Sequence, residues 1–127
     1  MTNYLGIDYG LAHIGLALAQ SSLATPLNQL KNDLNLFSNL NKLISHHMIT
    51  HIIVGLPSGP IEQDVRSFAS QLNRLTNIPV ILHDETLSSQ EATQKLSEIG
   101  ASRQKRRNNH SYAATLILED YLQSVLH

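Results

Sequence analysis

Acidic side chains occur at two points of the chain where a catalytic site could form. Asp8 lies within Gly6-Ile7-Asp8-Tyr9-Gly10, and Asp84 and Glu85 follow the short apolar run Pro79–Leu82. If the strands before them run parallel, the carboxylates project into one crevice, at the edge where open α/β sheets bind ligands. Such acids repel one another unless a divalent cation neutralises them, and Mg²⁺ suits an all-oxygen site. Two such ions about 4 Å apart can activate water against a phosphodiester.

Both acidic positions also have a structural interpretation. An aspartate near glycine is common in turns, so Asp8 could serve only as a turn or capping residue. Asp84 and Glu85 could simply mark the start of a surface helix. The spacing alone leaves catalysis and local structure open at both positions.

The basic side chains are concentrated in one short segment, although the whole chain is close to neutral. The formal net charge is −1, and four basic residues fall within five positions: Arg103, Lys105, Arg106 and Arg107. A local basic loop can contact phosphates even in a neutral domain, and such contacts position a nucleic-acid backbone rather than read its sequence. The alternative is a solvated loop without a partner.

Five extended segments predict a sheet beneath these residues. The expected strands are residues 4–10, 13–19, 22–30, 52–57 and 79–82. The first two predict a hairpin, because a glycine-bounded turn separates two apolar runs. Pro26 predicts that the third strand lies at an edge, since proline cannot donate to a central ladder. The apolar, β-branched segment 52–57 is typical of a buried parallel strand.

Four helices are predicted from apolar residues at helical spacing and from capping residues. They cover residues 33–47, 61–75, from Ser88 or Ser89 to Gly100, and 108–126. The first is expected to present an apolar face made of Leu34, Phe37, Leu40, Leu43 and Ile44. The order of elements predicts one α/β domain, residues 1–127, with a mixed five-stranded sheet. We expect strands 1–3 to be antiparallel, strands 4 and 5 to run parallel to strand 1, and helices to cover both faces.

The composition limits which side chains could bind a metal and indicates in which compartment the protein works. The chain has no cysteine, so a metal would have to be held by oxygen or imidazole. No apolar run approaches the roughly 20 residues of a membrane span, and the N-terminus lacks a signal pattern. We therefore expect a cytoplasmic globular protein without a membrane partner.

The chain resembles the YqgF (RuvX) family through motifs that occur in the family's order. The resemblance begins with Gly6-Ile7-Asp8-Tyr9-Gly10 and residues 14–17, continues through residues 53–57 and 65–69, and resumes within residues 83–92 and 113–122. It implies a ribonuclease H-like fold related to that of Holliday junction resolvases. It also implies metal-dependent hydrolysis of phosphodiester bonds, in the 5′ processing of pre-16S ribosomal RNA during ribosome biogenesis.

The resemblance further implies three catalytic positions. Asp8 and Glu85 match two acids of the family, and the third position, three residues before Ala113-Ala114, holds His110 instead of the usual aspartate. These residues would bind Mg²⁺ or Mn²⁺, with Asp84 as a supplementary ligand, and an imidazole ligand favours Mn²⁺. His110 could instead carry a proton, or be a plain exposed histidine in the first helical turn.

Other positions on the expected substrate side depart from the family. Thr86 replaces a phosphate-reaching arginine, His13 occupies a position often filled by arginine, and the loop Ser58-Gly59-Pro60 is short. Tyr9 and His13 are predicted to contact nucleic acid, the tyrosine by stacking on a base. His83 lies beside the carboxylates and could contact the substrate, but we expect it to have a packing role.

Three other functions stay open from the sequence. The same fold could bind RNA in ribosome assembly without cutting it, which Thr86 and His110 would explain. It could cut branched DNA, for which a two-fold dimer would be needed, so that monomer and homodimer are both open. The Asp8-Tyr9-Gly10 turn also resembles the phosphate-binding hairpin of actin-like ATPases and sugar kinases, but the chain is too short for their second lobe.

Overall fold

The structure, a computed structural model, describes residues 1–84 and 109–126. Its strands form one sheet in the order β3-β2-β1-β4-β5. The strands are β1 (Tyr4–Tyr9), β2 (His13–Ala19), β3 (Ala24–Lys31), β4 (His51–Leu56) and β5 (Val80–Asp84). β1 pairs antiparallel with β2 and parallel with β4, while β2–β3 is antiparallel and β4–β5 is parallel. The predicted mixed sheet is confirmed.

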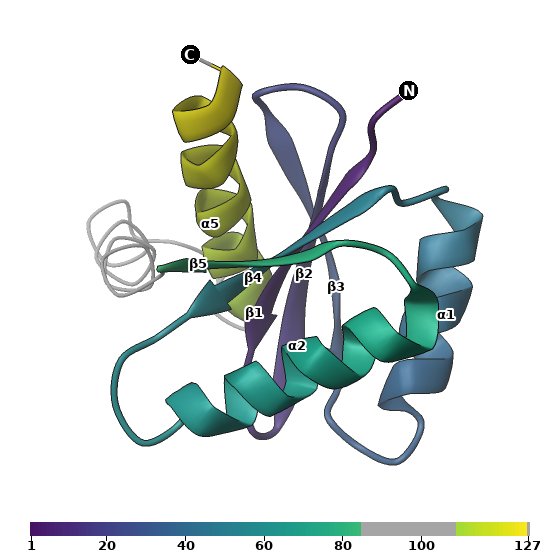
Figure 1. The fold of residues 1–127 in the computed structure, drawn as a ribbon, viewed down its shortest axis with the longest axis vertical. Coiled ribbons are helices and arrows are strands. Elements are labelled where there is room, and N and C mark those ends of the chain that lie inside the picture. Colours follow the sequence, from purple (N-terminus) through teal and green to yellow (C-terminus); the bar gives the residue numbers. More distant parts are fainter. Residues whose placement is uncertain (85–108, 127) are drawn as a thin grey trace.

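Helices lie on both faces of this sheet (Figure 1). α1 (Leu36–His46) and α2 (Glu62–Thr76) cover one face, and α5 (Asn109–Leu126) covers the other. The central strand β4 is apolar on both sides. In β4, Ile52 and Val54 pack with α1 and α2, whereas Ile53 packs with α5. A strand covered on both faces needs such an uninterrupted apolar sequence, and this explains the run in residues 52–57.

β3 and β5 form the two edges of the sheet. Pro26 lies in β3, opposite Ala17 of β2, as its missing N–H predicts. β5 follows α2 and pairs with β4 alone among the described strands. The carboxyl ends of β1, β4 and β5 therefore meet at one end of the sheet.

α1 begins at Leu36 rather than at Asp33, and the assignment of Leu34 to its apolar face is wrong. The Leu34 side chain is fully exposed, whereas Leu36 is 2% exposed. The Asp33 carboxylate accepts a hydrogen bond from the backbone N–H of Asn35 at 2.9 Å. This local turn competes with the helix and delays its start. The buried face consists of Leu36, Leu40 and Ile44.

The other described helices begin and end close to the predicted positions. α2 stops at Asn77, whose φ of 59° is left-handed, a conformation that asparagine tolerates at a helix end. The predicted helix from Ser88 or Ser89 to Gly100 lies outside the described residues. Within the described part of the chain, no helix is both long enough and apolar enough to cross a membrane.

Glycines allow α5 to approach the sheet closely. A Cβ atom at Gly6 would lie 2.8 Å from the Cβ of Leu118, and one at Gly15 would overlap the backbone of the first turn of α5. A larger residue at either position would push the helix away. The start of α5 is therefore seated directly on the β1–β2 pair, beside the carboxyl end of β1.

Candidate active site

Asp8 lies on the α5 face of the sheet, one residue before the end of β1. Its neighbour Ile7 packs on the opposite face, because successive side chains of a strand alternate. The Asp8 carboxylate is nearly enclosed, with 7% of the side chain exposed. A carboxylate in such surroundings needs a hydrogen-bonding or charged partner.

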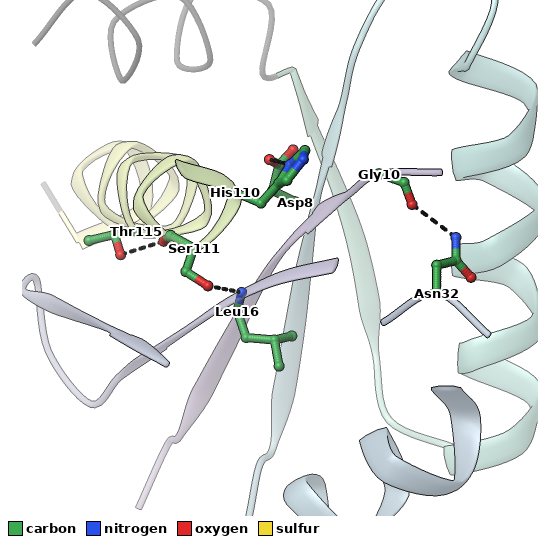
Figure 2. Close-up of polar contacts among 7 residues, drawn as sticks. All are labelled: Asp8, Gly10, Leu16, Asn32, His110, Ser111 and Thr115. Atoms are coloured by element: carbon green, nitrogen blue, oxygen red, sulfur yellow. Dashed lines mark hydrogen bonds and ion pairs between the residues drawn. The ribbon is translucent and has the colours of Figure 1, made fainter. Parts of the chain in front are cut away.

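His110, in the first turn of α5, is that partner (Figure 2). Its Nδ1 lies 2.8 Å from Oδ2 of Asp8, which makes a hydrogen bond and, when the ring is protonated, an ion pair. The His110 side chain is 42% exposed. One nitrogen thus contacts the buried carboxylate while part of the ring stays open to solvent. The fold joins two residues that are 102 positions apart in the chain.

Contact with Asp8 changes the charge state of His110. The hydrogen bond to the Asp8 carboxylate raises the pKa of His110 above its usual 6.5, partial burial lowers it, and the attraction of the negative charge raises it further. The net effect is a raised pKa. The imidazole therefore keeps its proton to a higher pH than a free histidine does.

Ser111 fixes the first turn of α5 on the sheet, a role that the sequence did not reveal. The backbone N–H of Leu16 donates to Oγ of Ser111 at 3.2 Å, in the fully buried interior. This bond lies at a register shift between β2 and β3, where Ile14 and Leu16 flank an irregularity. The Oγ1 of Thr115 donates to the Ser111 carbonyl at 2.9 Å (Figure 2). Ser111 thereby places its neighbour His110.

Asn32 supports the turn that follows Asp8, and the sequence did not single it out either. Its side-chain Nδ2 donates to the Gly10 carbonyl at 2.9 Å (Figure 2). Its backbone N–H donates to the Ala12 carbonyl, also at 2.9 Å. A Cβ atom at Gly10 would come within 3.0 Å of Cε1 of His110. Gly10 therefore leaves room for the imidazole, and Asn32 holds the turn in place.

The structure does not bring every predicted site residue to this pair. The ring of Tyr9 packs on the other face, with its centroid 4.8 Å from that of Phe68. His13 begins β2 and is half-buried, and Asp84 ends β5, exposed and opposite Leu56. The remaining predicted site residues lie outside the described residues: Glu85, Thr86, Arg103, Lys105, Arg106 and Arg107.

The residues of this site lie in a part of the chain that matches a known family. Residues 2–124 match RuvX, described as Holliday junction resolvase. The chain belongs to the RuvX family. A Rickettsia canadensis relative named "Putative pre-16S rRNA nuclease" is 34% identical, over 98% of this chain and 88% of the relative. A Chlamydia trachomatis serovar L2 relative of the same name is 36% identical, over 95% of this chain and 91% of the relative.

The fold of this RuvX chain also matches a solved structure. T. thermophilus RuvC in complex with a Holliday junction substrate superposes with a TM-score of 0.64 over 99% of this chain and 96% of RuvC. The two sequences are 12% identical, so this likeness establishes the fold alone. The predicted ribonuclease H-like fold and the predicted family are confirmed. The family is one of enzymes that hydrolyse phosphodiester bonds.

The donor atoms of the RuvX site are compatible with a divalent cation. A carboxylate oxygen and an imidazole nitrogen suit Mn²⁺, and ligands at right angles about 2.1 Å from one ion lie about 3 Å apart. The 2.8 Å between Oδ2 of Asp8 and Nδ1 of His110 is close to that spacing. Among residues 1–84 and 109–126, no three His, Cys, Asp or Glu side chains gather as metal ligands.

Proposed function

We propose that this chain is a metal-dependent endonuclease that acts in the cytoplasm on pre-16S ribosomal RNA, in its 5′ processing. The observation that carries the proposal is the 2.8 Å contact between the enclosed Asp8 carboxylate and His110 near the carboxyl end of β1. This is the end of an α/β sheet at which ligands usually bind. The names of the Rickettsia and Chlamydia relatives support RNA as the substrate.

Asp8, Glu85 and His110 are the proposed metal ligands, with Asp84 as a supplementary one. Bound Mg²⁺ or Mn²⁺ would supply Lewis acidity and lower the pKa of a water nucleophile. We expect Mn²⁺ to be preferred, because imidazole suits a transition metal better than it suits Mg²⁺. For Glu85 the support is its match to the family motif.

His110 has two possible roles in this proposal, and they use different atoms. As a metal ligand, Nδ1 of His110 would hold the cation together with Oδ2 of Asp8, which requires that Nδ1 carries no proton. As a proton carrier, it keeps the hydrogen bond to Asp8, and Nε2 exchanges a proton with the reacting groups. Asp8 is needed in both cases, because it holds the ring and supplies the negative charge.

The nucleic-acid backbone is proposed to contact the basic residues 103–107, with His13 and Tyr9 as further contacts. The position of His13 supports this contact. His13 begins β2, and Gly15, two residues further along the strand, pairs with Asp8. The Tyr9 ring is partly buried and packs against Phe68, so only its exposed part could stack on a base. Such contacts would position the RNA, while cleavage depends on Asp8 and His110.

Cleavage by an Asp8→Asn variant tests the proposal. The substrate is a 5′-extended pre-16S RNA fragment, cut in Mn²⁺ or Mg²⁺. We expect a loss of about 100-fold or more in rate, because the amide cannot supply the carboxylate charge. Asp33→Asn, at an exposed aspartate that caps a turn, is the matched control and should cut normally. Wild-type rates in Asp8→Asn would contradict the proposal.

Branched DNA is the second candidate substrate, favoured by the description of the family as Holliday junction resolvase. The same protein preparations can be assayed on a four-way DNA junction. If the wild-type protein cuts the junction but not the RNA, and Asp8→Asn cuts neither, the substrate is branched DNA. RNA binding without cleavage of either substrate would instead identify a binding module for ribosome assembly.

A further inference from the structure

A second contact between a histidine and a carboxylate joins the sheet to α5. Nε2 of His83 lies 2.7 Å from Oδ2 of Asp120. The His83 side chain is 21% exposed and that of Asp120 is 62% exposed. The His83 ring also meets the Tyr121 ring edge-on, with centroids 5.8 Å apart and an interplanar angle of 84°. Two consecutive residues of α5 thus hold one imidazole of β5.

His83 lies in the same row of the sheet as Asp8. It pairs with Gly55 of β4, and the parallel pairing of β1 with β4 runs up to Ile7 and Val54, so that Asp8 and Gly55 come next. Adjacent strands lie about 4.8 Å apart, which places the Cα atoms of Asp8 and His83 about 10 Å apart. Gly55, between them, contributes no side chain. Both side chains reach α5, so both lie on the same face.

The contact lies near the carboxyl end of an edge strand. β5 is an edge strand, and β4 is its neighbour in the sheet. His83 lies one residue before the end of β5 at Asp84. α5 carries His110 in its first turn and Asp120 further along the same helix. The His83–Asp120 pair therefore ties the carboxyl end of β5 to the helix that places His110 against Asp8.

We propose that His83 and Asp120 are positioning residues. They fix the carboxyl end of β5, which carries the proposed ligand Asp84, relative to α5, which carries the proposed ligand His110. This inference rests on the proposed function. The contact works as a hydrogen bond from Nε2–H to the carboxylate and needs no charge on the ring. Because a pair this exposed contributes little to global stability, its effect should appear in the site and not in unfolding.

Asp120→Ala, compared with Glu119→Ala, tests the inference. Glu119 precedes Asp120 on α5, and its Oε2 accepts the backbone N–H of Ala24 at 2.9 Å, at the start of β3. Both variants remove one carboxylate that links α5 to an edge strand, but β3 is the edge away from the site. We expect Asp120→Ala to raise the Kd for Mn²⁺ about tenfold and Glu119→Ala to leave it unchanged. Asp120→Asn, which keeps an acceptor, should restore most of the affinity.

Calorimetric titration with Mn²⁺ and hydrogen exchange at Ile81–Asp84 separate the outcomes. Equal Kd values for Mn²⁺ in the two alanine variants would overturn the inference. So would unchanged exchange at the end of β5 in Asp120→Ala, since the strand would then not depend on the contact. If the wild-type protein neither binds Mn²⁺ nor cuts RNA, the proposed function is wrong. The hydrogen-exchange comparison would still decide whether Asp120 holds the end of β5.

Discussion

At the residue scale, the charge on His110 depends on Asp8. The hydrogen bond from Nδ1 to the enclosed carboxylate favours the protonated ring, although burial of the ring opposes it. If His110 binds the metal through Nδ1, as proposed, a proton and a metal ion would compete for that nitrogen. Metal binding at this site should strengthen as the pH rises through the raised pKa of His110.

The pKa of His110 should fall in Asp8→Asn. The amide removes the negative charge while the burial of the ring remains, so the pKa drops toward or below 6.5. In the wild type the folded pKa is the higher one. The stability contributed by His110 is then fully present below the unfolded pKa near 6.5, and it is lost as the pH rises through the folded pKa. NMR titration of the imidazole protons measures the shift, with the exposed His46 as an internal control. Identical His110 titrations in both proteins would refute the coupling.

At the element scale, α5 organises the polar contacts of the site. Within the described part of the chain, its side chains bond to four strands: His110 to β1, Ser111 to β2, Glu119 to β3 and Asp120 to β5. The apolar period of residues 108–126 predicts the helix and its buried stripe. It cannot predict these bonds, because they depend on the order of the strands and on the irregularity in β2. The position of His110 comes from family resemblance, while Ser111 and Asp120 carry no local signal.

Ser111→Ala should destabilise the protein by about 1–3 kcal/mol, because it leaves the buried N–H of Leu16 without an acceptor. Urea unfolding measures the change. Ser38→Ala is the matched control, because Ser38 is an exposed serine within α1 and should change the free energy of unfolding by less than about 0.5 kcal/mol. Equal unfolding midpoints for the two variants would show that Ser111 does not hold α5.

At the scale of the whole molecule, strand order and direction follow from the sequence more completely than the site does. Pro26 predicts the edge, and the β-branched run in residues 52–57 predicts a strand buried on both faces. Pro26 acts through its own missing backbone N–H, and the run acts through several adjacent apolar residues, so both features can be recognised in the sequence. The helical period misplaces Leu34 because a single side-chain bond, from the Asn35 N–H to Asp33, overrides it.

The basic residues 103–107 should govern the salt dependence of RNA binding for the molecule as a whole. Replacing Arg103, Lys105, Arg106 and Arg107 by glutamine should weaken binding to every RNA sequence to a similar extent. The slope of log K against log salt should flatten by about 0.7 for each phosphate of a single-stranded RNA that the protein no longer neutralises. Binding titrations at several salt concentrations measure the slope. Weakening confined to certain base sequences would contradict the assignment.

Diffraction from crystals soaked in Mn²⁺, with anomalous data, tests the central claim most directly. We expect an ion bound by a carboxylate oxygen of Asp8 and a nitrogen of His110, each at about 2.0–2.3 Å. The ion should replace the hydrogen bond between Asp8 and His110. The same soak of Asp8→Asn should give no ion. An Mn²⁺ ion bound elsewhere, with the 2.8 Å contact between Oδ2 of Asp8 and Nδ1 of His110 intact, would contradict a metal site built on this pair.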